Sequence, residues 1–289
     1  MSGSTVCTVC PRRCRLAPGA LGACRARRNE GGRVVADGYG RATSLALDPI
    51  GKKPLARFMP GTLVVSVGGY GCNLSCPFCQ NAEISQAGAR DVSWRAVSPD
   101  ELVAIALDAR SRDPRVSGIA YTYNEPLVAW EYVRDCARLA HDAGLVNVLV
   151  SNGCVGDAVL DGLEGLVDAA NIDLKGFTDG FYDACGAGPG ALERVKAVIE
   201  RLAADPGCHL EVTTLVVPGM NDADDEIDAA ARWLAALDGG CGRDTIAYHV
   251  TRFFPRWRLT DRGPTPVETV YRLADVARRH LAHVFTGNC

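Results

Sequence analysis

Three cysteines in one short segment are the residues of this sequence best suited to chemistry. Cys72, Cys76 and Cys79 lie in residues 70–80, YGCNLSCPFCQ, with three residues in the first gap and two in the second. Three thiolates on one loop can hold three irons of a 4Fe–4S cluster and leave the fourth iron open to a small ligand. Structural zinc is the alternative, but it needs four closed ligands, and no second CxxC pair follows nearby. The spacing therefore favours a cluster over zinc and over three buried thiols.

A strand is expected to position this loop. Residues 63–68, LVVSVG, form an apolar, β-branched run that ends in glycine, which is typical of a buried strand. The cysteines then follow the carboxyl end of that strand. This is the end at which α/β folds place their chemistry.

A second group of cysteines occurs in residues 1–30. This segment contains Cys7, Cys10, Cys14 and Cys24 together with six arginines and several turn residues. It cannot bury a core of its own, so we expect a metal to hold it together. The spacing does not choose between zinc and an auxiliary iron–sulfur cluster, and a flexible thiol-bearing arm is the alternative. The arginines would offset thiolate charge or bind an acidic electron donor.

Composition limits the class of protein. The chain has 289 residues, 47% of them hydrophobic, which suits one large α/β domain with a small appendage. A net charge of −3 predicts no binding to nucleic acid or to an anionic membrane surface. We expect no transmembrane helix and no secretory signal, because no long apolar run occurs. Thirteen cysteines then indicate metal binding in a reducing compartment, and the predicted location is cytoplasmic.

Strand and helix patterns alternate from residue 63 onward. We predict strands at 63–68, 117–122, 146–150, 169–174, 210–217 and 246–250, with 282–285 as an extra edge strand. Helices are predicted near 99–110, 126–143, 157–166, 191–203, 224–237 and 265–279. Such repeats imply parallel strands with right-handed crossovers, in an open six-stranded barrel or a flat doubly wound sheet. The predicted organisation is a cysteine-rich segment at 1–30, a connector at 31–62 and the main domain at 63–289.

The central cysteine loop resembles that of the radical S-adenosylmethionine (radical SAM) superfamily, whose pattern is CxxxCxΦC. Phe78 occupies the aromatic position Φ. The resemblance implies a 4Fe–4S cluster whose open iron chelates the amino and carboxylate groups of SAM, with the aromatic residue against the adenine. It also implies the α/β fold of this superfamily, a partial (β/α)6 TIM-type barrel.

Two later loops resemble SAM-binding motifs of the same superfamily. Asn124 and Glu125 lie in TYNEP, a form that resembles the AmmeMemoRadiSam subgroup, and the resemblance implies that Glu125 binds the ammonium group of SAM. By itself, Glu125 could simply favour the start of the helix at Pro126. Ser151 and Asn152 begin an SNG turn similar to that of glycyl-radical activating enzymes, such as pyruvate formate-lyase activating enzyme. A plain turn is the alternative.

Two further positions complete the predicted cofactor site. Asp173 and Lys175 resemble the DLK motif of the activating enzymes, although a strand could also end in a solvated Asp and Lys. His249 ends the sixth strand where those enzymes place a histidine beside SAM, and a hydrogen-bonded structural histidine is the alternative. A cation site beside SAM is in doubt, because Val150 stands where those enzymes have aspartate. The remaining cysteines are interpreted as ordinary small residues: Cys136, Cys154, Cys185, Cys208, Cys241 and Cys289.

The sequence therefore predicts a radical SAM enzyme that resembles the activating enzymes. It would cleave SAM reductively to a 5′-deoxyadenosyl radical and abstract hydrogen, from a protein or peptide substrate if the likeness extends that far. An electron donor such as flavodoxin or ferredoxin is implied as a partner. The alternative is an iron–sulfur electron carrier or a zinc-stabilised adaptor without SAM chemistry.

Overall fold

The computed structural model describes residues 3–237 and 245–289, and Cys241 lies outside these ranges. Within them, eight strands form the central sheet in the order β14-β13-β12-β11-β10-β9-β7-β6, and neighbours pair in parallel except β6 with β7. The α/β fold class with a partial barrel is confirmed. The predicted strands correspond to β7 (Leu63–Gly68), β9 (Val116–Tyr121), β10 (Val146–Ser151), β11 (Ala169–Asp173), β12 (His209–Val216) and β13 (Ala247–Arg252).

Two further strands form the edges of this sheet. The predicted extra strand is β14 (Val284–Gly287), which pairs in parallel with β13. At the other edge, β6 (Ser44–Pro49) runs antiparallel to β7, so the segment predicted as a connector contributes to the sheet. An edge strand has one paired neighbour and an exposed side, so its sequence needs little apolar character. The segment between β6 and β7 begins with the 3₁₀ helix η1 (Ile50–Lys52) and ends in a turn in which the Thr62 N–H donates to the Met59 carbonyl at 3.2 Å.

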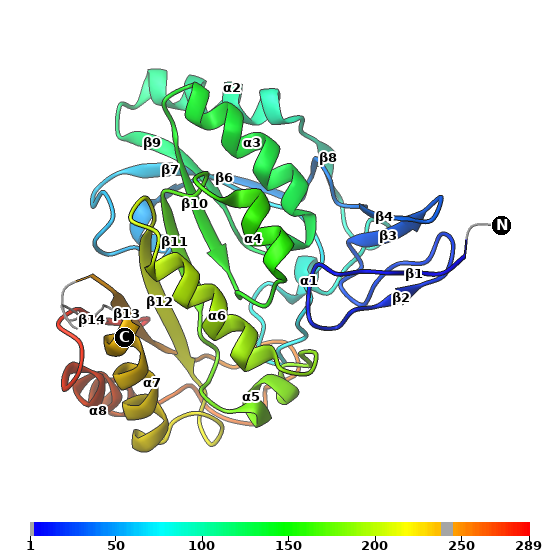
Figure 1. Ribbon diagram of the computed structural model, residues 1–289. Coiled ribbons are helices and arrows are strands. Elements are labelled where there is room, and N and C mark those ends of the chain that lie inside the picture. Colours follow the sequence, from blue (N-terminus) through cyan, green and yellow to red (C-terminus); the bar gives the residue numbers. More distant parts are fainter. Residues whose placement is uncertain (1–2, 238–244) are drawn as a thin grey trace.

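Helices cover the outer face of the sheet (Figure 1). Ser98 caps the first long helix by accepting a hydrogen bond from the Glu101 N–H at 3.2 Å, as its capping box predicts. The helix predicted at 126–143 begins instead as a 3₁₀ turn, η2 (Pro126–Ala129). The α-helices are α1 (Ala82–Ser85), α2 (Pro99–Arg112), α3 (Trp130–Asp142), α4 (Asp157–Leu163), α5 (Asp179–Ala184), α6 (Ala191–Ala203), α7 (Asp224–Leu237) and α8 (Val267–Arg278).

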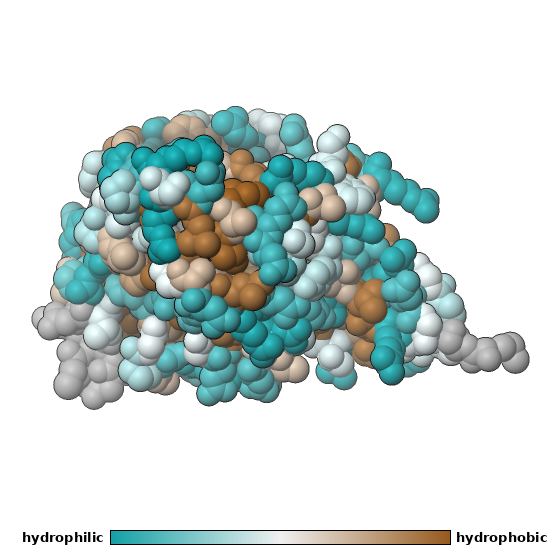
Figure 2. Space-filling model, turned by 90° about the horizontal axis from the view of Figure 1, so that it is seen from above, coloured by the Kyte–Doolittle hydropathy of each residue, from teal (hydrophilic) through white to brown (hydrophobic). Residues whose placement is uncertain are grey.

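Successive side chains of a strand point to opposite faces of the sheet, so the hydrophobic core has two parts. Val65 and Ile119 belong to the large core shared with the helices, whereas Val64 and Ala120 on the opposite face pack with Ile50 and Leu55. The residues between β6 and β7 therefore cover part of the inner face of the barrel. Seen from above, apolar side chains gather in a hollow with a hydrophilic rim (Figure 2).

The N-terminal segment forms small hairpins at one side of the barrel (Figure 1): β1 (Thr5–Val6) with β2 (Arg15–Leu16), and β3 (Arg27–Glu30) with β4 (Arg33–Ala36). Another small pair joins β5 (Arg41–Ala42) to β8 (Arg95–Ala96). Arg27, which is 4% exposed, donates two hydrogen bonds of 2.6 and 2.8 Å to the carboxylate of Glu131 in α3. This bidentate pair fixes the segment to the barrel.

No helix in the described part of the chain is long and apolar enough to cross a lipid bilayer.

Candidate cluster and cofactor site

The central cysteine loop connects β7 to α1, as the sequence predicts, and its three cysteines are free thiols. The Leu74 N–H donates to the Cys72 sulfur at 3.3 Å, and the Asn152 side-chain amide donates to the same sulfur at 3.6 Å. The Ser85 hydroxyl lies 3.3 Å from the Cys79 sulfur. Hydrogen bonds to thiolate sulfur are among the features that tune iron–sulfur clusters.

Groups near the loop shift the pKa values of two of its thiols in opposite directions. Burial raises the pKa of Cys72, and the Glu125 carboxylate raises it further. The pKa of Cys76 is lowered, first by a hydrogen bond from Cys185 and also by the positive charge of Lys175. Cys185 directly follows the last residue of α5, far from Cys76 in the sequence, and it carries no motif that would have revealed this contact.

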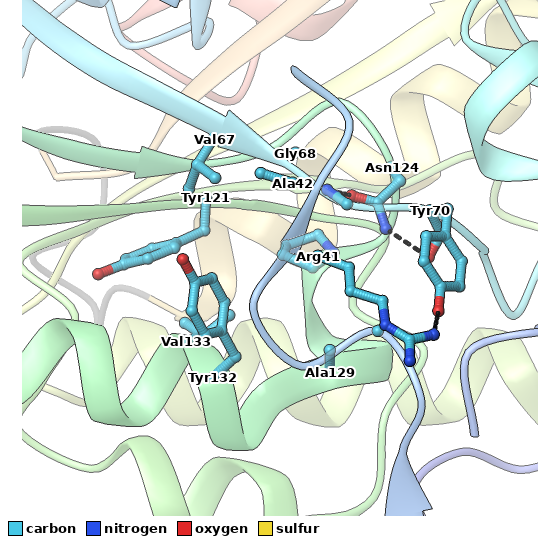
Figure 3. A pocket seen from close by; sticks show the side chains of 13 residues that line it. Arg41, Ala42, Val67, Gly68, Tyr70, Tyr121, Asn124, Ala129, Tyr132 and Val133 are labelled. Carbon is cyan, nitrogen blue, oxygen red and sulfur yellow. Dashed lines mark hydrogen bonds between the residues drawn. The ribbon is translucent and has the colours of Figure 1, made fainter. Parts of the chain in front are cut away.

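Asn124 holds the cysteine loop by its backbone. Its side-chain oxygen accepts from the Gly69 N–H at 3.0 Å, and its amide donates to the Tyr70 carbonyl at 3.1 Å (Figure 3). The same amide donates to the Gly71 carbonyl at 3.0 Å. A cavity of about 30 Å³ lies beside Asn124, where Arg41 donates to the Tyr70 hydroxyl at 3.1 Å. This volume suits water, not a cofactor. The Asn124 side chain thus fixes the backbone of the cysteine loop.

Glu125 joins two loops at the carboxyl end of the sheet. Its carboxylate, 2% exposed, accepts from the Leu127 N–H at 3.0 Å, which supports the start of η2. It also accepts from the Ser151 hydroxyl and the Asn152 N–H, both at 2.8 Å. Burial raises the pKa of Glu125 to about 7 despite these bonds. A carboxylate has about four acceptor positions, so three donors leave room for a further one.

The SNG turn also reaches the cysteine loop. The Asn152 amide donates to the Asn73 side-chain oxygen at 2.8 Å, and the Asn73 amide donates to the Cys154 carbonyl at 2.7 Å. Both asparagines are buried. Asn152 therefore connects the SNG turn to the cysteine loop beneath the site. Asn73 is part of this hydrogen-bond network, and the sequence analysis did not predict it.

Asp173 and Lys175 form an ion pair of 2.7 Å at the end of β11. Burial by itself would lower the pKa of Lys175, but the negative charges of Asp173 and Cys76 outweigh it and raise the pKa above its usual range. Lys175 is therefore a cation beside the cysteine loop.

His249 lies deeper in the barrel and bonds to Glu211. The two side chains are 2.5 Å apart, Glu211 also contacts His209 at 2.9 Å, and His249 stacks on Phe285. Glu211 further accepts from the Ala56 and Arg57 N–H groups. Burial would raise the pKa of Glu211, but these donors hold it well below its usual range. The structure thus favours a hydrogen-bonded structural role for His249.

Phe78 lies within an aromatic cluster. It is 4% exposed, and its ring centroid is 5.8 Å from that of Phe181 and 6.5 Å from that of Phe253. The adenine contact implied by the family pattern therefore stays a prediction.

The four N-terminal cysteines lie close together. The Cys7 N–H donates to the Cys14 carbonyl at 2.9 Å at the end of the β1–β2 hairpin. The pKa of Cys10 is raised to about 11, first by burial and to a smaller extent by the charges of the Cys24, Cys7 and Cys14 thiolates. Among the described residues, however, no three Cys, His, Asp or Glu side chains gather closely enough to hold a single metal ion.

The central loop fits an iron–sulfur cluster by its donor set. Three soft thiolate ligands lie on one loop, with hydrogen-bond donors to two of the sulfurs and a lysine beside the third. Around it the structure brings together Asn124, Glu125, Ser151, Asn152, Asp173 and Lys175, whereas His249 is held apart by Glu211. Within this group the Ser151 hydroxyl is bonded to the Glu125 carboxylate, and the same carboxylate is bonded to the Asn152 and Leu127 N–H groups, so Glu125 serves as a shared acceptor for two loops.

Comparison with known proteins assigns the chain to a family. The sequence profile of the radical SAM superfamily matches residues 66–234, more than half of the chain. The chain is 40% identical over 283 residues to an uncharacterized protein of Methanocaldococcus jannaschii, covering 98% of this chain and 80% of that protein. The chain therefore belongs to the radical SAM superfamily, and membership implies a 4Fe–4S cluster and SAM.

More distant likenesses are found to one enzyme by sequence and to one solved structure by fold. The chain is 28% identical over 216 residues to the benzylsuccinate synthase activating enzyme of Thauera aromatica, covering 69% of this chain and 63% of that enzyme. The solved structure of a radical SAM methyltransferase from Sphaerobacter thermophilus has a TM-score of 0.59 at 18% identity, covering 78% of this chain and 66% of that chain. The chain thus spans about two thirds of the length of both proteins. The second likeness shows the fold alone.

Replacement of Glu211 tests whether its carboxylate holds the barrel interior together. We expect Glu211→Gln to lower the free energy of unfolding at pH 7 by about 3 kcal/mol, because a buried charged partner of two histidines is removed. Since the pKa of Glu211 is depressed in the folded state, its contribution should be present above pH 4.5 and be lost as the pH falls below that value. Urea denaturation of both proteins, at matched iron content, measures this.

The exposed Glu193 provides the control, and Glu193→Gln should change stability by no more than about 0.5 kcal/mol. A Glu211→Gln variant as stable as the control at pH 7 would contradict the role given to Glu211.

Proposed function

We propose that this protein is a radical SAM enzyme of the activating-enzyme-like type, which acts on a protein or peptide substrate. The observation that carries the proposal is the junction of three loops in which Glu125 and Asn152 connect the SAM-motif loops directly to Cys72. When bound, the cluster supplies one electron that cleaves SAM to methionine and a 5′-deoxyadenosyl radical. The residues of this chain bind and orient the reacting groups and keep water away from them.

The charged residues of the site match the two ends of the amino acid part of SAM. In this proposal Glu125 offers its remaining acceptor position to the SAM ammonium group, and the Lys175 ammonium, whose charge acts on Cys76 of the cysteine loop, binds the SAM carboxylate. Asp173 holds Lys175 in place. The neighbouring Val150 offers no ligand to a cation, so we assign neutralisation of the SAM carboxylate to Lys175.

Two observations support a protein or peptide substrate. The relative from Thauera aromatica is named as an activating enzyme, and the sheet ends at β14 and β6 without closing on itself, so the barrel described here has an open side. A one-electron donor such as flavodoxin or ferredoxin completes the proposed system. The acidic surface of such a donor would complement the exposed Arg13 and Arg15 of the N-terminal segment.

Cys76→Ala tests the central assignment. Two remaining thiolates should not hold the cluster, so iron bound at the loop and release of 5′-deoxyadenosine should both fall to background. The measurement uses anaerobic, reconstituted protein with SAM and dithionite. Cys208→Ala, at a buried cysteine away from the loop, is the control and should keep both. Release at the parent rate from Cys76→Ala, or none from the parent, would leave the electron carrier or adaptor as the better explanation.

Glu125→Gln tests the contact with SAM. The loss of a charge-assisted hydrogen bond should cost about 1.5–3 kcal/mol, which raises the dissociation constant roughly ten- to a hundredfold. Because the pKa of Glu125 is about 7, the parent should bind SAM more weakly as the pH falls from 7.5 to 6, while the variant shows no such change. Equilibrium binding at matched iron content measures both. An unchanged dissociation constant would return Glu125 to its helix-start and loop-bridging roles.

Isotope transfer tests the substrate class. The enzyme is incubated with SAM, reductant and candidate partner proteins that carry deuterated glycine, and 5′-deoxyadenosine is analysed by mass spectrometry. Deuterium should appear in 5′-deoxyadenosine with a protein partner. Transfer from a small metabolite and from no protein would refute the protein substrate while leaving the radical chemistry in place.

A further inference from the structure

We propose that a cavity between the N-terminal segment and the central cysteine loop binds the phosphate group of a small-molecule ligand. Arg12, Ala23 and Arg25 line one side of this cavity, and residues 72–75 with Gln86 line the other. Its volume is about 310 Å³, whereas ligand pockets usually measure roughly 300–1,000 Å³. The cavity therefore has room for a phosphate group together with an organic body.

The cavity is separate from the proposed cofactor site. Of the three cysteines of the central loop, Cys72 lines it and Cys76 and Cys79 do not. Glu125 and Lys175, to which the SAM contacts are assigned, do not line it either. The cavity thus lies on the side of the loop that faces the N-terminal segment, and binding there goes beyond the proposed function.

Two guanidinium groups give the cavity a positive charge. Arg12 and Arg25 are half-buried, and in the part of the chain that the structure describes neither forms an ion pair, whereas Arg27 does. Among the described residues, no acidic side chain lines the cavity. A phosphate ester carries a charge of about −1.5 to −2 at pH 7, which matches two arginines. The planar guanidinium group also binds phosphate oxygens through two parallel N–H bonds.

Contacts with the barrel hold Arg12 at the cavity. Its Nε donates to the Asn73 carbonyl at 3.1 Å. The backbone of Gly188 packs on that of Arg12, and a Cβ atom at Gly188 would lie only 2.7 Å from the Arg12 nitrogen. Because Nε bonds to the cysteine loop, the two terminal nitrogens are the pair of donors that Arg12 offers to a phosphate.

Backbone strain and a hydrogen bond hold Arg25. Its φ is 62°, in a region that long side chains rarely adopt, and its N–H donates to the Gly22 carbonyl at 2.8 Å. The Arg25 Nη1 donates to the Gln86 side-chain oxygen at 3.4 Å, and the Gln86 amide donates to the Leu74 carbonyl at 3.0 Å. Residues in strained conformations of this kind cluster at functional sites. The strain at Arg25 therefore agrees with a ligand site.

Calorimetric titration of the reconstituted full chain with inorganic phosphate, at constant ionic strength, tests this site. The parent should bind about one phosphate per chain, and acetate, with its single charge, should bind more weakly. Arg12→Gln and Arg25→Gln should each raise the dissociation constant about tenfold or more, because each removes a charged hydrogen-bond donor. Arg33→Gln is the control, at an exposed arginine of the same segment outside the cavity, and should keep the parent value.

A second pair of variants keeps the test decisive if the loss of Arg12 disturbs the cysteine loop. Ala23 is exposed and lines the cavity, so Ala23→Asp adds a negative charge there without removing a hydrogen bond. This charge should abolish phosphate binding, whereas the neutral Ala23→Asn, of the same size, should retain it.

Three results would overturn the site: no saturable binding of phosphate by the parent, equal binding by Ala23→Asp and Ala23→Asn, or loss of binding in Arg33→Gln. Acetate that binds as tightly as phosphate would refute the assignment to phosphate. None of these measurements requires SAM cleavage, so their outcome is independent of the proposed function.

Discussion

The buried carboxylate of Glu125 is the constraint on which the arrangement of this site depends. Taking a carboxylate out of water is costly unless donors satisfy it, and here the donors come from the start of η2 and from the SNG turn. The loops that follow β9 and β10 are thereby held in one position. Asn152 extends the same network to the Cys72 sulfur, so three loops of distant sequence form one rigid base.

Three asparagine side chains also hold the cysteine loop in position. Asn124 clamps the backbone of the cysteine loop, and Asn73 and Asn152 bond to each other beneath it. Each amide offers both donors and an acceptor, which suits it to satisfy loop backbone that has no strand partner. A loop that must present three sulfurs needs this support, because ligand geometry is only as precise as the groups that orient it.

The N-terminal segment depends on the barrel and also shapes it. Arg27 fixes the β3 hairpin to α3 through Glu131, and the backbone of residues 8–12 packs on glycines of the loops that follow β10 and α5. A segment this short has little apolar surface to bury alone. Its position over the central loop explains why Gly71, Gly156 and Gly188 have no room for a side chain.

The sequence by itself determined the fold class and the family. Apolar runs with period two or 3.6 gave the strands and helices that build the parallel sheet, because burial dictates those patterns locally. The spacing of Cys72, Cys76 and Cys79 identified the family, because a cluster loop must place its ligands within a few residues. The edge strand β6 escaped prediction because an exposed edge leaves little apolar signal.

Only the tertiary structure decided which predicted residues act together. It joined Glu125 to Ser151 and Asn152, turned Asn124 toward the loop backbone, and paired His249 with Glu211 deeper in the barrel. It also brought Cys185 to Cys76 and Cys24 to Gly71. These contacts join residues far apart in the sequence through side chains that carry no local pattern. Their physical origin is the folding of parallel strands, which gathers the carboxyl-end loops at one edge of the sheet.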